Sequence, residues 1–153
     1  MNRHVFLFIL LSGLQFFVMG QATPAFNPTG TYKLDNKTYM KDGDKYGYYG
    51  FIRVKLLSRD TIAVSLYVCN GAPSYNSGSF VDTLVYRDHR AVYHHCESDT
   101  SCRITFSFTS KGLDVDQVQA DLNFGCGFGH AVLADFHYKK VSAKVPVIEM
   151  EDD

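Results

Sequence analysis

The sequence predicts an all-β protein, and more specifically an eight-stranded antiparallel up-and-down β-barrel of the lipocalin-like or avidin-like type. Apolar and polar residues alternate with a period of two in most segments between turns, which is typical of half-buried strands. No stretch of helical length after residue 22 carries a 3.6-residue apolar period. The connections are short, so consecutive strands should pair antiparallel and the first should meet the last. A two-sheet β-sandwich is the alternative that the same pattern permits.

The first 22 residues have the features of an export signal. Arg3 and His4 form a polar start, residues 5–11 are almost wholly apolar, and Gly20-Gln21-Ala22 offers small residues to a signal peptidase. The apolar run is interrupted from Ser12 onward, so it is too short for a membrane span. We therefore expect cleavage after Ala22 and a secreted or periplasmic protein.

Removal of residues 1–22 leaves 131 residues, enough for one domain, which we place at 23–144. The only charged residue lost is Arg3, so 14 Lys and Arg face 16 Asp and Glu, a net charge of −2. Nucleic-acid binding and membrane-surface binding both need clustered positive charge, and we expect neither. Residues 145–153 end in E-M-E-D-D and are predicted to form a disordered acidic tail.

The first expected strand, residues 30–34, places Tyr32 and Leu34 on one face, and a polar, Tyr-rich loop at 36–47 follows it. Four further strands are expected before the last third of the chain, at residues 51–57, 61–69, 80–87 and 90–96. Their inward positions carry Val, Ile and Leu, and their outward positions carry Ser, Thr, Arg and Lys, as a small barrel requires.

The last third of the chain predicts three more strands. Ile104, Phe106 and Phe108 alternate with polar residues in the first of them, and Gly112 provides the turn into the second, which runs from Leu113 to Gln119. The third is expected at 131–141. Before it lies the glycine-rich loop 125–129, in which we expect a kinked entry into the last strand or a preformed recognition loop.

The up-and-down order separates long connections from short ones. Loops 36–47, 70–78, 97–101 and 120–130 should lie at one end of the barrel, and turns of two or three residues should lie at the other. All four cysteines fall at the end with the long loops. An even count behind an export signal favours two disulfides. We favour Cys102 with Cys126 and Cys69 with Cys96, and the alternative is Cys96 with Cys102 and Cys69 with Cys126.

Tyrosine is abundant, with ten residues, whereas tryptophan is absent. A rigid ring that carries a hydroxyl suits contacts with proteins or glycans, although aromatic residues are also common in ordinary strands. The candidate binding residues lie in or beside the long loops: Tyr39, Tyr46, Tyr48, Tyr75, Phe124, Phe128 and His130.

Metal and catalytic chemistry are not favoured. Neighbours in a strand point to opposite faces, so His94 and His95 cannot both bind one ion with His130. Asp114 and Asp116 share a face that we expect to be solvated, which makes tuned acid or base chemistry unnecessary to explain them. We predict no cofactor, no metal and no enzymatic activity.

The segments C-x-I-x-F-x-F, V-x-Q and C-G-F-G, with the closing Y-K-K, resemble a group of small exported bacterial proteins of unknown function. This resemblance covers about the last third of the chain. The early G-T-Y-K and the late F-H-Y-K-K resemble the first and last strands of lipocalin-like and avidin-like barrels, in architecture only. The lipocalin G-x-W is missing and the spacing of periplasmic lysozyme inhibitors is not matched, so the resemblance implies no functional residue.

These observations predict an exported, disulfide-stabilised binding protein. Its long loops would recognise a protein or glycan partner, and inhibition of a hydrolase is one form that such binding would take. A carrier of a small apolar ligand inside the barrel is the second hypothesis, and a hydrolase is the third. The sequence names no partner and leaves the oligomeric state open.

Overall fold

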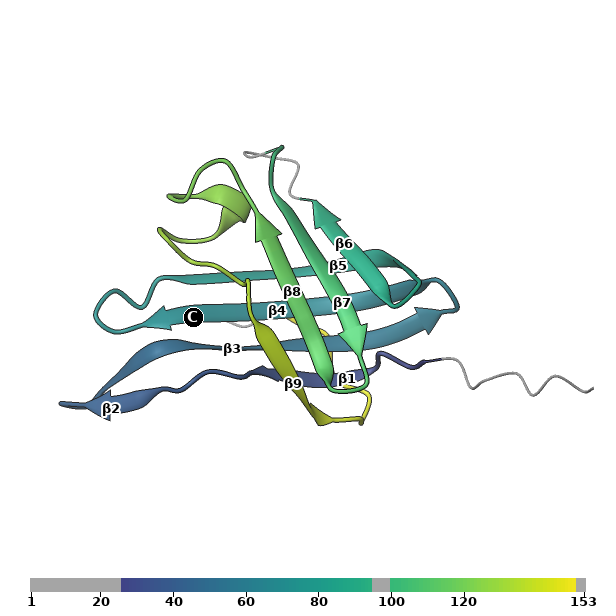
Figure 1. The fold of residues 1–153 in the computed structure, drawn as a ribbon, viewed down its shortest axis with the longest axis horizontal. Helices are drawn as coiled ribbons and strands as arrows, with labels where there is room; N and C mark the ends of the chain where they lie inside the picture. Colours follow the sequence, from purple (N-terminus) through teal and green to yellow (C-terminus); the bar gives the residue numbers. More distant parts are fainter. Residues whose placement is uncertain (1–25, 95–99, 151–153) are drawn as a thin grey trace, which may run out of the picture.

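The structure is a computed structural model that describes residues 26–94 and 100–150. It is all-β, a closed antiparallel barrel of eight strands with one further strand outside the barrel (Figure 1). The predicted fold class is therefore confirmed.

The described residues form nine strands and one short 3-10 turn, η1, at Gly125–Gly127. The strands are β1 (Gly30–Leu34), β2 (Tyr39–Lys41), β3 (Asp44–Ser58), β4 (Thr61–Gly71), β5 (Ser77–Arg87), β6 (Arg90–His94), β7 (Arg103–Thr109), β8 (Gly112–Val118) and β9 (His137–Ser142). Their order in the sheet is β1-β9-β8-β7-β6-β5-β4-β3-β2. Pairing of β1 with β3, from Gly30 opposite Val54 to Lys33 opposite Phe51, closes the barrel and leaves β2 outside.

The interior follows the predicted alternation. Ile62, Val64, Leu66 and Val68 of β4 are all buried, and their neighbours of opposite parity face outward or lie on the wall. Aromatic rings complete the core: Tyr32 and Tyr86 each pack edge-on against Phe108, with ring centroids 6.0 and 5.6 Å apart. The barrel is thus filled by its own side chains.

One strand, β2, was not expected, and several strand boundaries differ from those expected: β3 begins at Asp44 and not at 51, and β5 begins at Ser77 and not at 80. β2 occupies part of the expected loop 36–47, and it forms a hairpin with β3 around Asp42-Gly43, both of which have positive φ. All three β2 residues are exposed, so β2 has no buried face and no apolar alternation to reveal it. The last strand begins at His137 and not at Ala131, because the segment before it turns back across the end of the barrel.

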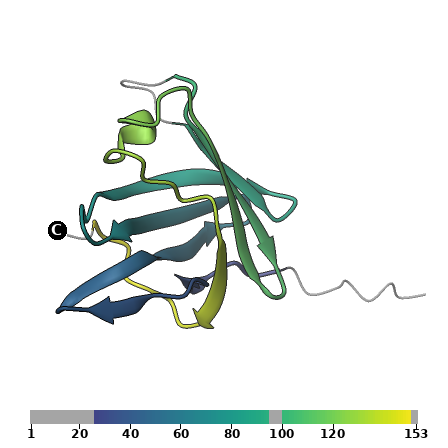
Figure 2. The same ribbon diagram turned by 60° about the vertical axis from the view of Figure 1, so that its left-hand side comes forward.

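Neighbouring strands of the barrel differ in the extent of their backbone pairing. Within residues 26–94, β5 and β6 pair at two positions, Tyr86 with Ala91 and Arg87 with Arg90. Beyond these the two strands diverge, as Figure 2 shows, and Phe80 stacks on Tyr93 with ring centroids 3.9 Å apart. Side-chain packing therefore replaces backbone pairing along this part of the wall, which we call the β5-β6 seam.

The described part of the predicted acidic tail, residues 145–150, contacts the outer wall of the barrel through Glu149. The Ser65 hydroxyl donates to the Glu149 carbonyl oxygen at 2.7 Å, and the Glu149 carboxylate lies 3.8 Å from the Arg53 guanidinium. These contacts bury Ser65, which would otherwise face solvent on β4. Residues 151–153 lie outside the described part of the chain.

Candidate functional site

Three long connections gather at one end of the barrel, and we call residues 35–43, 72–76 and 119–136 the rim. The two-residue turns at 59–60, 88–89 and 110–111 lie at the opposite end. Most of the expected loop at 97–101 lies outside the described residues. Long loops on a rigid barrel are a common place for binding.

Hydrogen bonds join two rim segments, 72–76 and 119–136, to each other and to β3. The Tyr75 hydroxyl donates to Asp44 Oδ1 at 2.8 Å and accepts from the Lys45 amide at 3.0 Å. The Asn76 side-chain amide donates to the His130 carbonyl at 3.0 Å, and the Tyr48 hydroxyl donates to the Ala131 carbonyl at 2.7 Å. The rim backbone is therefore held in one arrangement before any partner binds.

A disulfide between Cys102 and Cys126, with Cα atoms 5.0 Å apart, anchors the longest rim segment to the start of β7. This pairing confirms the favoured prediction for these two residues. Cys126 lies in η1 with φ of 60°, a left-handed conformation that non-glycine residues adopt at a cost. The crosslink thus fixes a loop whose local backbone is strained.

The second predicted disulfide is wrong, because Cys69 is a buried free thiol. Cys69 has the parity opposite to the inward-facing Val68, so its sulfur lies on the outer wall, where it accepts from the Gly71 amide at 3.4 Å. Its proposed partner Cys96 lies outside the described residues. The alternative pairing of Cys69 with Cys126 is also wrong, since Cys126 is bonded to Cys102.

Two of the seven predicted binding residues are part of the scaffold. The Phe128 ring is buried and packs flat over the backbone of Gly78, where an added Cβ would collide with it. Tyr48 is half-buried, tilted against Phe136 at 4.9 Å, and bonded to the Ala131 carbonyl. Phe128 and Tyr48 therefore hold the rim segment 119–136 against the barrel.

The other five predicted residues lie at the rim surface or next to it. Tyr39 is 60% exposed and stacks on Tyr46 with ring centroids 5.1 Å apart, and Phe124 is 70% exposed. The His130 Nδ1 atom lies 2.6 Å from Asn123 Oδ1, which orients an exposed ring. Tyr75, in the rim segment 72–76, is also exposed.

Sequence reasoning missed two exposed apolar residues of the rim, Met40 and Leu122. Met40 follows Tyr39 in β2, and the Asp42-Gly43 hairpin signal next to it could have placed it in a strand with two exposed faces. Leu122 carries no such signal. They add two exposed apolar side chains, one on each of two rim segments.

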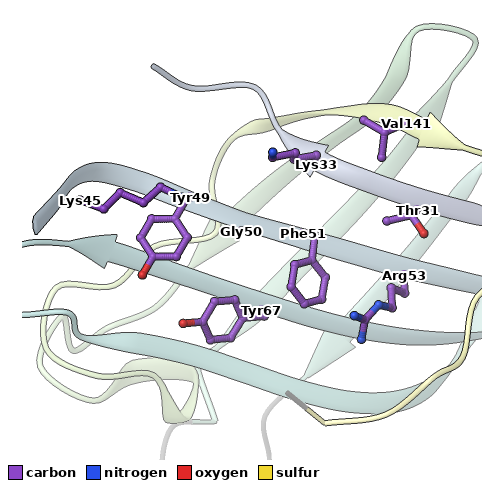
Figure 3. Close-up of a pocket in the computed structure, with 9 residues that line it drawn as sticks. All are labelled: Thr31, Lys33, Lys45, Tyr49, Gly50, Phe51, Arg53, Tyr67 and Val141. Atoms are coloured by element: carbon purple, nitrogen blue, oxygen red, sulfur yellow. The ribbon is translucent and has the colours of Figure 1, made fainter. Parts of the chain in front are cut away.

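Sequence reasoning also missed a groove on the outer wall of the barrel. Its volume is about 370 Å³, and residues of β1, β3, β4 and β9 line it (Figure 3). The outward-facing residues of β3 and β4 are aromatic there, although the outward-facing residues of a barrel strand are usually polar.

One carboxyl group of the rim, that of Asp135, has a pKa that is raised by partial desolvation and secondarily by the charge of Asp116. Asp135 is solvent-exposed, so the effect on stability is small. Because the raised pKa makes the ionised form unfavourable in the fold, Asp135→Asn should raise the free energy of unfolding at pH 7 by less than about 0.5 kcal/mol.

This gain should disappear as the pH falls below 3.8, where the carboxyl is protonated in the folded and the unfolded chain alike. Urea unfolding at both pH values measures it, and NMR titration of the Asp135 carboxyl in wild type and in Asp116→Asn separates the two causes. A gain that persists at low pH would contradict the assignment.

Among the described residues, no three His, Cys, Asp or Glu side chains gather as metal ligands would. No helix in the described part of the chain is long and apolar enough to cross a membrane. Comparison with family models, with curated protein sequences and with solved structures finds no match to this chain.

Proposed function

We propose that the protein is an exported, non-enzymatic binding protein that recognises a protein or glycan partner through the rim. The observation that carries this proposal is the combination of exposed apolar side chains with a fixed backbone. Tyr39, Met40, Leu122 and Phe124 are each more than half exposed, on segments held by hydrogen bonds and a disulfide. Such a surface loses little conformational entropy on binding.

Export is supported by the signal-like residues 1–22 and by the disulfide. A disulfide persists in oxidising compartments, such as the outside of the cell and the periplasm, and is rare in the cytosol. The carrier hypothesis has less support, because Tyr32, Phe106 and Tyr138 fill the interior that a ligand would need. Inhibition of a hydrolase is one outcome of rim binding, in which the Phe124 loop would occupy the enzyme's cleft.

Variants of exposed residues test the rim. Phe124→Ser and Tyr39→Ser remove rings that are 70% and 60% exposed, and Val85→Ser removes a wall side chain that is 62% exposed, near the opposite end. The oxidised mature protein would serve as bait for envelope and culture-medium extracts and for a glycan array. We expect wild type and Val85→Ser to capture the same partner, and each rim variant to bind it at least about tenfold more weakly.

Melting temperatures of all four proteins control for folding and should agree, since the three positions are exposed. Equal capture by the rim variants and wild type would refute the proposal. A partner that Val85→Ser alone fails to capture would place the contact on the wall instead.

A further inference from the structure

The groove on the outer wall is separate from the rim and has a chemistry of its own. We call it the wall groove, and its lining residues are Thr31, Lys33, Lys45, Tyr49, Gly50, Phe51, Arg53, Tyr67 and Val141. Its volume of about 370 Å³ is within the range of about 300 to 1,000 Å³ of small-molecule sites. It is large enough for a small aromatic ligand.

The floor of the wall groove consists of three half-buried aromatic side chains. Phe51 of β3 lies opposite Tyr67 of β4, and the two rings stack with centroids 5.7 Å apart and planes 28° apart. Tyr49 extends this row along β3, as Figure 3 shows. A hydrogen bond with the Cys69 thiol, together with burial, raises the pKa of the Tyr49 hydroxyl, so this side chain stays neutral. The floor therefore offers flat, uncharged faces to a ring.

Positive charge surrounds this floor. Lys45 Nζ lies 3.8 Å from the centre of the Tyr49 ring, the Arg53 guanidinium lies 4.4 Å from the centre of the Phe51 ring, and Lys33 borders the groove from β1. None of the nine lining residues is acidic. A bound ring would exclude water from these cations and so strengthen their attraction for an anion.

The chain's own tail shows that this charge attracts carboxylates. The Glu149 carboxylate lies 3.8 Å from Arg53, and the Glu149 carbonyl is fixed to the wall by Ser65 at 2.7 Å. A ligand anion that reaches Arg53 must compete with Glu149. The tail is thus positioned to weaken binding of any acid in the groove.

We propose that the wall groove binds a small flat acid, that is, a ring compound that carries a carboxylate or sulfonate. Its ring lies on Phe51 and Tyr67, and its anionic group lies at Arg53, where Glu149 competes with it. Lys33 and Lys45 add positive charge at the border of the groove. This site is independent of the rim and of the partner proposed for it.

The probe for the test is 8-anilinonaphthalene-1-sulfonate, an aromatic sulfonate whose fluorescence rises in apolar sites. Its neutral relative N-phenyl-1-naphthylamine has the rings without the charge. We expect wild type to bind the sulfonate saturably and at least about tenfold more tightly than the neutral compound, because the cations contribute.

Single substitutions test whether the sulfonate binds in the wall groove. Phe51→Ser, Tyr67→Ser and Arg53→Gln should each weaken sulfonate binding at least about tenfold, whereas Glu149→Gln should tighten it severalfold. Phe124→Ser and Val85→Ser are matched controls, in which an exposed ring of the rim and an exposed wall side chain are removed, and both should bind as wild type does.

If Phe51→Ser lowers the melting temperature, Arg53→Gln and Glu149→Gln still decide the question, because neither side chain is part of the interior. Unchanged binding in both, or equal affinity for the charged and neutral probes, would overturn the proposal. Loss of sulfonate binding in Phe124→Ser alone would also overturn it and would place the probe at the rim. Since partner capture at the rim is a separate measurement, the two proposals can fail independently.

Discussion

Phe128→Ala is expected to lower the free energy of unfolding by about 3 to 5 kcal/mol, the usual cost of removing a buried ring. Phe128 is 1% exposed, and its ring covers the backbone of Gly78 at the start of β5. The same loop donates a backbone hydrogen bond from Gly129 to the Ser77 carbonyl at 2.9 Å. Loss of the ring therefore leaves a cavity and weakens the attachment of the rim to β5. Urea denaturation, followed by circular dichroism, measures the change.

A double-mutant cycle with Gly78→Ala tests whether this contact is the cause. An added Cβ at position 78 collides with the Phe128 ring, so Gly78→Ala alone should cost about 1 to 3 kcal/mol. In the Phe128→Ala background the methyl group has room, and its cost should be smaller by at least about 1 kcal/mol. Additive effects would show that the ring and the glycine backbone do not determine each other's position.

Removal of the disulfide has the second large expected effect. The double variant Cys102→Ala/Cys126→Ala should be less stable by about 3 to 4 kcal/mol, because the crosslink closes a loop with a sequence separation of 24. Thermal unfolding of wild type under reducing conditions should show the same loss.

Cys69→Ala is the matched control, since Cys69 is buried but unbonded. It should be nearly as sensitive to reduction as wild type is. If reduction leaves the melting temperature of both proteins unchanged, the crosslink does not constrain the unfolded chain as proposed.

Much of the fold could be predicted because the barrel has one packed face. The alternation of Ile62, Val64, Leu66 and Val68 defines an inner side, and short turns define antiparallel neighbours. The clustering of long connections at one end follows from that order alone. All four cysteines were placed at this end, which allowed the Cys102–Cys126 bridge but did not distinguish it from the alternative pairing.

Features without a buried face could not be predicted in this way. β2 is exposed on both sides, and the wall groove depends on outward-facing rings in two strands whose register the sequence does not state. Cys69 was paired incorrectly because its position along the barrel axis was used and its outward parity was not. Phe128 was predicted to be a binding residue in a long loop, but its ring contacts Gly78, 50 residues earlier in the chain, and periodicity does not show such a contact.

The β5-β6 seam is the part of the described barrel wall with the least backbone pairing. In the part of the wall that the structure describes, β5 and β6 are joined by the backbone pairs of Tyr86 with Ala91 and of Arg87 with Arg90, a shorter ladder than any other in the barrel, and by the stack of Phe80 on Tyr93. Local openings occur where the fewest cooperative bonds must be lost. We therefore expect local opening of the described wall to begin along this seam, at the side of the barrel, before the crosslinked end opens.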